Sequence, residues 1–115
     1  MAKYERHFKG NFNTFLENLN SEILGGSMSA SHEDGSDIIC DDVRCAVRVY
    51  ERYSYTGGNR VSASVTVLSC DDDIFVSAIT SGGSQAMFFK INTIGEDSFL
   101  DAVEDAVERS ITNSK

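Results

Sequence analysis

The sequence predicts an α+β domain in which a curved antiparallel β-sheet, a meander of four to six strands, carries an N-terminal and a C-terminal helix on one face. Two observations support this prediction. Between residues 43 and 79, apolar and polar side chains alternate, which is the period of a half-buried strand. On either side of that region, apolar residues recur at three- and four-residue spacing, as in an amphipathic helix. Both helical stripes need an apolar surface, and the valine-rich strand face is the largest one, so we expect two layers.

The N-terminal part of the chain predicts an edge strand and then a helix. Residues 3–9 alternate weakly, with Tyr4 and Phe8 on one side. The helical stripe that follows consists of Phe12, Phe15, Leu16, Leu19 and Ile23. An asparagine on either side of Phe12 can cap the start of this helix, and the glycine pair after Leu24 is typical of a helix end.

The serine-rich stretch that comes next predicts two short extended segments. Residues 27–32 form a strand with Met28 and Ala30 on one face, and residues 38–40 extend again. Between them, the Asp-Gly-Ser sequence at 34–36 is typical of a turn. Two aspartates then lead into a long hairpin.

The parity of the apolar residues predicts the register of that hairpin. The odd-numbered apolar residues are Val43, Cys45, Val47, Val49 and Tyr53 in one strand and Val61, Ala63, Val65 and Val67 in the next. These residues share one face only if the loop between the strands has an odd length, so we expect a loop of three or five residues through 56–59. The opposite face then carries a basic outer stripe made of Arg44, Arg48, Tyr50, Arg52 and Arg60.

The next turn follows from the same parity rule. Ile74, Val76 and Ala78 have even numbers, so a loop of even length must join them to the odd valines. Asp71 and Asp72 supply a two-residue turn, which pairs Leu68 with Phe75 across the two strands.

The C-terminal third predicts a last strand and a helix. After a turn at 81–84, residues 86–91 form a strand, and a capping box of Thr93 and Glu96 starts the helix. The apolar stripe of this helix is Phe99, Leu100, Val103, Ala106 and Val107. The element order resembles that of helix-grip folds, in which a sheet wraps a long C-terminal helix.

Composition narrows the class of protein. The chain has 115 residues, which predicts a single domain over 1–115. A net charge of −8 argues against binding to nucleic acid or to an anionic membrane. There is neither a membrane-length apolar run nor a leader sequence, so we expect a cytoplasmic protein. The three cysteines are odd in number and lack metal-ligand spacing, so we expect them to be reduced.

Catalytic and cofactor signatures are missing from the sequence. The glycine-rich stretches 57–60 and 81–84 each link two strands, whereas phosphate-binding loops precede a helix. His7 and His32 stand apart from the cysteines, and the aspartates at 71–73 lack the spacing of a calcium loop. We therefore expect a protein without catalytic residues, metal or cofactor.

The leading hypothesis from the residues is a non-catalytic interaction module that forms a homodimer. The predicted register places Leu68, Phe75 and Ile79 on the same face as Arg48 and Tyr50. An apolar patch flanked by arginine has the composition of an interface centre. Two other interpretations of this face are a solvated surface whose arginines pair with acidic turns or a neighbouring strand, and a binding site for an anionic ligand or nucleic acid.

The alternative hypothesis is a small-molecule-binding domain with a cleft between the sheet and the C-terminal helix. Parity places Glu51 on the apolar face, where a carboxylate is costly unless it is paired. It either meets Tyr4, Lys3 or Lys90 at the rim or anchors a ligand. The candidate residues at the mouth of the cleft are Glu51, Tyr53, Ser81, Gly82, Gly83, Ser84 and Gln85.

Three stretches of sequence are distinctive. They are MAKYE (1–5) with FKG (8–10), VYERYSYTGGNRV (49–61), and SAITSGGSQA (77–86) followed by FKINT (89–93). With Gly95-Glu96 and Phe99-Leu100, the whole chain resembles a family of small, uncharacterised bacterial proteins described only as a domain of unknown function. The resemblance implies a bacterial, cytosolic, standalone domain and transfers no functional residue.

Overall fold

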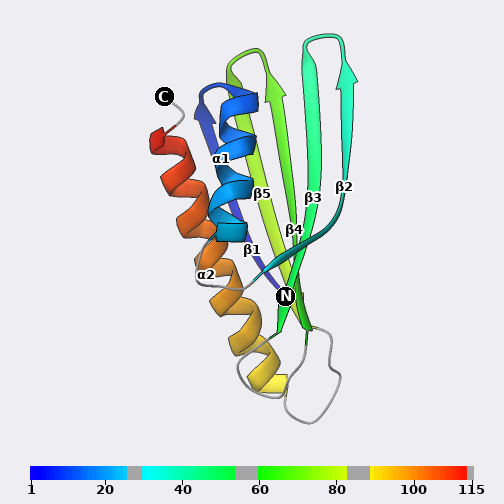
Figure 1. The fold of residues 1–115 in the computed structure, drawn as a ribbon, viewed down its shortest axis with the longest axis vertical. Helices are drawn as coiled ribbons and strands as arrows, with labels where there is room; N and C mark the ends of the chain where they lie inside the picture. The colour runs from blue at the N-terminus through cyan, green and yellow to red at the C-terminus, as the bar shows by residue number, and fades with distance from the viewer. Residues whose placement is uncertain (26–29, 54–59, 83–88, 114–115) are drawn as a thin grey trace.

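Five antiparallel strands and two helices make up the residues that the computed structural model describes, which are 1–25, 30–53, 60–82 and 89–113, with 89–98 described by backbone alone (Figure 1). In chain order the elements are β1 (Ala2–Lys9), α1 (Phe12–Gly25), β2 (Ser31–Cys40), β3 (Val43–Tyr53), β4 (Arg60–Cys70), β5 (Asp73–Gly82) and α2 (Phe89–Asn113). The strands form one open sheet in the order β1-β5-β4-β3-β2. This arrangement confirms the predicted α+β class and the edge strand at the N-terminus.

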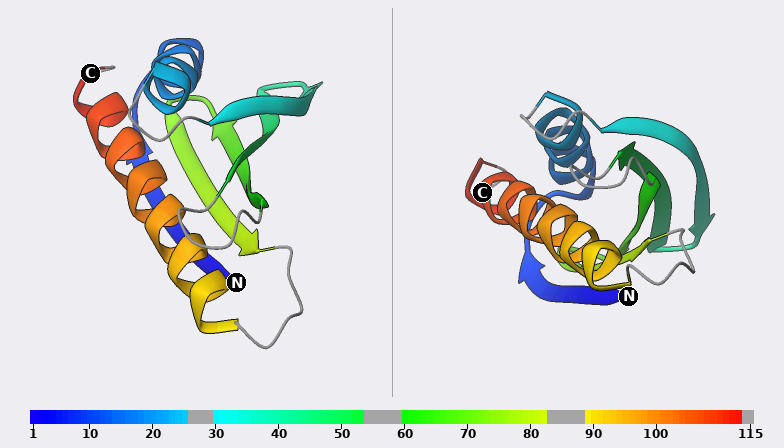
Figure 2. Two further views of the ribbon diagram at one scale, coloured as in Figure 1. Left: turned by 60° about the horizontal axis from the view of Figure 1, so that its bottom comes forward. Right: turned by 90° about the horizontal axis from the view of Figure 1, so that it is seen from below.

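The two helices lie side by side on one face of the sheet, which curls around them (Figure 2). α2 packs against β1, β5 and β4, and α1 packs against α2. The Tyr50 hydroxyl of β3 donates a hydrogen bond to Asn20 Oδ1 of α1 at 2.8 Å, which joins the sheet to this helix. We call the helix-covered side of the sheet the inner face and the opposite side the outer face.

A cluster of polar side chains fixes β1 to α2. Tyr4 and Arg6 of β1 both donate hydrogen bonds to Glu108 of α2, and Arg6 Nε lies 3.1 Å from the carboxylate. The hydrogen bond from Tyr4 lowers the pKa of Glu108, while burial and the same hydrogen bond raise the pKa of Tyr4. The contact between β1 and α2 is therefore strongest while Glu108 is ionised, and it weakens as the pH falls through that pKa.

The core confirms the predicted helical stripes and the predicted inner faces of β4 and β5. Within the described residues, the buried side chains of the strands and helices interlock in one cluster. From β4 and β5 it includes Val61, Ala63, Val65, Val67, Ile74, Val76 and Ala78. From the helices it includes Phe12, Phe15, Leu19, Ile23, Phe99, Val103, Ala106 and Val107, with Leu16 and Leu100 partly buried beside it.

The predicted register between β3 and β4 is wrong. Val47 pairs with Thr66, and Arg48 pairs with Val65, so the even-numbered residues of β3 share the inner face with the odd-numbered residues of β4. The last pair is Tyr53 with Arg60, which leaves an even number of residues between them; the loop itself, 54–59, lies outside the described residues. The odd-numbered residues of β3 that were expected in the core therefore lie on the outer face: Val43, Cys45, Val47, Val49 and Tyr53.

Arginine side chains occupy the inner face of β3 because they stack on core aromatics. The Arg44 guanidinium lies 4.5 Å from the ring centroid of Phe12, and that of Arg52 lies 4.9 Å from the centroid of Phe99. Guanidinium groups are planar and weakly hydrated, and their stems are apolar, so they can cover a core edge that lysine would not. Arg52 is only 7% exposed. The four stripe residues from β3 therefore lie on the inner face, contrary to the prediction, whereas Arg60 of β4 is exposed on the outer face as expected.

The predicted turn at 34–36 is also wrong, because β2 runs through it. β2 pairs with β3 over its whole length, and its register shifts between His32 and Asp34. A Cβ at Gly35 would lie 2.8 Å from the backbone oxygen of Val47. The missing side chain of Gly35 thus lets β2 and β3 approach each other closely, and the residue does not form a turn. All of β2 is exposed, and only its start, at His32, shares a pocket with α1.

The prediction for the start of the last helix also needs correction. α2 begins at Phe89, so residues 89–91 are helical and are not the end of a strand. The predicted capping box at Thr93 therefore falls inside the helix. The remainder of the predicted strand, 86–88, lies outside the described residues. The turn at Asp71 and Asp72 is confirmed, because Cys70 pairs with Asp73 and Leu68 with Phe75.

We expect Gly35→Ala to lower the free energy of unfolding by about 1 to 3 kcal/mol, because the new methyl group meets strand backbone that cannot move aside cheaply. Hydrogen exchange should show the loss of protection confined to β2 and β3. Gly25→Ala is the control, since nothing lies within 4 Å of a Cβ there. Equal stability of the two variants would contradict the close approach at Gly35.

Candidate functional site

The outer face of the sheet is an uncovered surface on which exposed apolar side chains, including Ile38, Val43, Leu68 and Ile79, gather. We call its central part the outer patch. It consists of Val43, Cys45, Val47 and Val49 from β3, Ser64, Thr66, Leu68 and Cys70 from β4, and Phe75, Ser77 and Ile79 from β5. These side chains project away from both helices, because alternate residues of a strand point to opposite sides and the residues between them are buried under the helices.

An apolar row crosses the outer patch from one sheet edge to the other. The pairing of the strands aligns His7, Phe75, Leu68, Cys45 and Ile38 in that order. Leu68 is 39% exposed and Ile38 is 59% exposed, whereas inner-face neighbours such as Val67 are fully buried. Large apolar side chains gathered on one side of a small domain mark an interaction surface more often than a solvated one.

Charged side chains surround the outer patch and are absent from its centre. β1 contributes Lys3, Glu5, His7 and Lys9 along one edge. Asp34 of β2 lies at the opposite edge, in the same cross-strand row as Lys3. An uncharged centre with a charged rim is the usual layout of a protein interface.

The structure divides the predicted interface set between the two faces. Leu68, Phe75 and Ile79 lie on the outer face, as expected. Arg48 and Tyr50 lie on the inner face, where Tyr50 is 1% exposed and Arg48 Nη2 pairs with Asp37 at 2.9 Å. These two residues therefore cannot belong to a surface with Leu68.

The predicted ligand-cleft set is partly brought together. Glu51, Ser81 and Gly82 line a pocket of about 390 Å³ with Arg60 and Ser62. The serine hydroxyls of 62 and 81 lie 3.0 Å apart, and Glu51 forms an ion pair with Arg60 at 2.5 Å.

The position of this pocket differs from the expected cleft between sheet and C-terminal helix. Glu51, Ser62 and Ser81 are in register across the outer face, so the pocket opens on the side away from α2. Tyr53 is 67% exposed, and its ring lies beneath the Arg60 guanidinium. The other predicted members, Gly83, Ser84 and Gln85, lie outside the described residues.

Sequence reasoning missed the valines of β3 as outer-patch residues. The clearest sign that the even-numbered face of this strand is buried was that Ala46 and Tyr50 alternate there with the arginines. Both are buried, opposite Val67 and Ala63. A strand with apolar residues on both faces contributes to two surfaces, and the arginines obscured that pattern.

Other kinds of site find little support in the described part of the chain. It contains no group of three or more histidine, cysteine or acidic residues placed to hold a metal ion. Neither α1 nor the described part of α2 combines the length and apolar character that crossing a bilayer requires. The cysteines are free thiols, and all three point to the outer face.

The fold and this surface define the class of protein: a small α+β domain whose open antiparallel sheet has one face covered by helices and one face bare. Residues 1–111 match the model of DUF6054, described as a family of unknown function, and the chain belongs to that family. A search of curated proteins finds no match.

Proposed function

We propose that this protein is a non-catalytic interaction module that forms a homodimer through the outer patch. The observation that carries the proposal is the bare, uncharged centre of the outer face, where Leu68 and Ile79 are each 39% exposed. Two sheets can pack face to face about 10 Å apart, with the side chains of the two contacting faces interdigitated. A second copy of the same face has the shape and the polarity that this arrangement needs.

The layout of the outer face suits a two-fold axis that runs along β4. Such an axis places Leu68 on the partner's Leu68 and Ile79 near the partner's Val49, because β5 and β3 flank β4 symmetrically. It also places Lys3 of β1 opposite the partner's Asp34, since these two residues end the same row. The apolar centre and the charged edges therefore complement themselves.

The available area is sufficient for a stable contact. With strands about 4.8 Å apart and a rise of about 3.3 Å per residue, the face spans roughly 600 Å² per protomer. Two such faces bury more than the roughly 1,000 Å² expected of a biological interface.

The test of this proposal is the oligomeric state in solution. Sedimentation equilibrium under reducing conditions should show a dimer for the unaltered chain, and reduction excludes disulfide-linked species formed by the outer-face cysteines. Leu68→Lys should weaken association at least about tenfold, because it places a charge at the centre of the contact. The matched control is Leu24→Lys on α1, a leucine that is also 39% exposed but lies away from the outer patch.

Two outcomes would count against the proposal. One is a chain that remains monomeric at several hundred micromolar. The other is a dimer that Leu68→Lys and Leu24→Lys weaken equally, which would place the contact elsewhere. A charge exchange gives further support: Lys3→Glu should weaken the dimer, and adding Asp34→Lys should restore it.

A further inference from the structure

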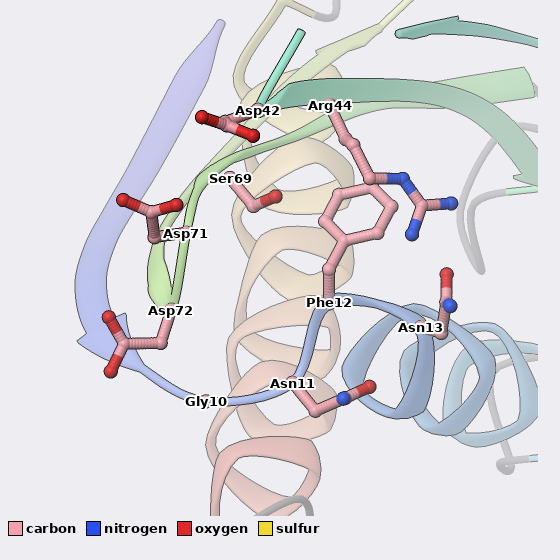
Figure 3. Close-up of a pocket in the computed structure, with 9 residues that line it drawn as sticks. All are labelled: Gly10, Asn11, Phe12, Asn13, Asp42, Arg44, Ser69, Asp71 and Asp72. Carbon is pink, nitrogen blue, oxygen red and sulfur yellow. The ribbon is translucent and has the colours of Figure 1, made fainter.

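A second polar pocket lies at the opposite side of the sheet from the outer patch, where α1 begins. Its volume is about 280 Å³, and it opens between the first turn of α1 and the two aspartate turns of the sheet (Figure 3). Arg44 and Phe12 form one side, Ser69 lies at the centre, and Asp42 and Asp71 form the other side. Positive and negative groups are therefore separated across one small pocket.

The cationic side of the pocket is Arg44. Its guanidinium rests on the Phe12 ring, and its Nε is buried without a hydrogen-bond partner among the described residues. No described carboxylate forms an ion pair with Arg44. Arg48, four residues further along the same face of β3, is by contrast paired with Asp37. Stacking on Phe12 does not neutralise the charge of Arg44, so the part of its guanidinium that lines the pocket can pair with an anionic group.

Two further groups favour an anion on this side. Ser69 is 3% exposed, and its hydroxyl points into the pocket toward the Phe12 ring (Figure 3). In the described residues this buried hydroxyl has no side-chain hydrogen bond within the protein, so it is available to a ligand. The first turn of α1 contains no acidic residue, so the positive end of the helix dipole is not neutralised there.

The anionic side of the pocket is built from the two turns. Asp42 and Asp71 come from the β2–β3 and β4–β5 connections, and their carboxylates lie on the far side of Ser69 from Arg44 (Figure 3). Neither forms an ion pair within the described residues. Asp71 has a φ of 57°, and the pairing of Cys70 with Asp73 holds it in place.

We infer that this pocket binds a small zwitterion of the free amino acid class, with its carboxylate on Arg44 and Ser69 and its ammonium group toward Asp42 and Asp71. A simple anion would be repelled by the three aspartates that line the pocket, and a simple cation would leave the Arg44 charge unpaired. A molecule with both charges a few ångströms apart satisfies both sides. The volume is at the small end of the range for ligand pockets, which suits a ligand of this size.

The test is a titration of the ¹⁵N-labelled protein, followed by amide NMR. The probes are glycine, L-alanine and L-serine, with acetate and methylammonium as the two half-ligands. Zwitterions should shift the amides around residues 10–14, 42–45 and 69–72 in a saturable way. Each half-ligand should bind at least tenfold more weakly.

Variants separate the two sides of the pocket. Arg44→Met keeps an unbranched apolar stem over Phe12 and removes the charge, and Asp71→Asn keeps a residue that tolerates a positive φ. Each should weaken zwitterion binding at least tenfold. Arg60→Met is the matched control, because Arg60 also stacks on an aromatic ring but lies outside this pocket.

Three results would overturn the inference. They are the absence of saturable shifts with any zwitterion, acetate binding as tightly as glycine, and zwitterion binding that Arg44→Met and Asp71→Asn leave unchanged. Because the pocket and the outer patch share no residue, the Leu68→Lys variant should bind the zwitterion like the unaltered chain. Failure of the dimer proposal therefore leaves this test intact.

Discussion

Val65→Asp should abolish the folded state at neutral pH, whereas Val47→Asp should leave it intact. Val65 is 1% exposed and lies on the inner face beneath the helices. The residue opposite Val65 is Arg48, but its guanidinium already pairs with Asp37 and donates to the backbone oxygen of Val47. A second carboxylate buried there still costs several kcal/mol, which is comparable with the entire stability of a small domain. Val47 lies on the outer face, where an aspartate can reach water. The cost there is about 1 kcal/mol from lost strand propensity.

This pair tests the assignment of the two faces, because the two valines have the same size and sit on neighbouring strands. Circular dichroism and the dispersion of the amide NMR spectrum report whether each variant folds. Val65→Ala and Val47→Ala, compared by urea unfolding, keep the test quantitative if Val65→Asp does not express. If both aspartate variants unfolded, or if both folded, the register of β3 against β4 would be incorrect.

Tyr50 should make the protein lose stability in alkaline solution. Its side chain is 1% exposed, and burial raises its pKa to about 12 from the ordinary 10.0, an effect that the nearby Arg48 only partly offsets. A raised pKa means that the folded protein binds the phenolic proton more tightly than the unfolded chain does. The resulting stabilisation is complete below pH 10 and is lost as the pH rises from 10 to about 12. Two pH units correspond to about 2.7 kcal/mol.

The measurement is the free energy of unfolding in urea at pH 8 and at intervals up to pH 12. Tyr50→Phe is the comparison that isolates this residue from the other alkaline titrations, including that of Tyr4. At pH 8 the variant should be about 1 kcal/mol less stable, because it lacks the hydrogen bond to Asn20. Its stability should then fall less steeply. Parallel curves for the two proteins would show that Tyr50 does not carry the alkaline sensitivity.

The helices and the β4–β5 hairpin could be predicted from the sequence because one local rule decides each of them. The three- and four-residue spacing of Leu19 and Ile23 has no strand interpretation. The Asp71-Asp72 turn is two residues long, so it fixes the pairing of Leu68 with Phe75 without reference to the rest of the fold. In both cases the information lies within a few residues of the feature.

The β3–β4 register was not predictable from the same rules. It depends on a longer loop, and parity then had to be inferred from which side chains avoid water. Arg44 and Arg52 defeated that inference because aromatic rings of α1 and α2 receive their guanidinium groups. Those rings are distant in sequence, and no residue near the arginines indicates that they stack on aromatic side chains.

The candidate sites follow the same division. The outer patch was predicted only in part. The local turn placed Leu68 and Phe75 on the correct face, whereas the wrong β3–β4 register placed the valines of β3 in the core. The zwitterion pocket was not anticipated at all. Arg44 and Ser69 face each other across β3 and β4, so the pocket depends on the β3–β4 register, and Phe12 at the start of α1 completes it.

The exposed strand β2 has a consequence for how the protein avoids misassembly. Its backbone pairs on one side only, and the exposed Ile38 and Ile39 make its free edge attractive to any other extended chain. Glu33, Asp34 and Asp37 lie along this strand and place several negative charges on the same edge. Two such edges repel each other at neutral pH, so the carboxylates oppose the pairing of β2 strands from different molecules and the aggregation that would follow.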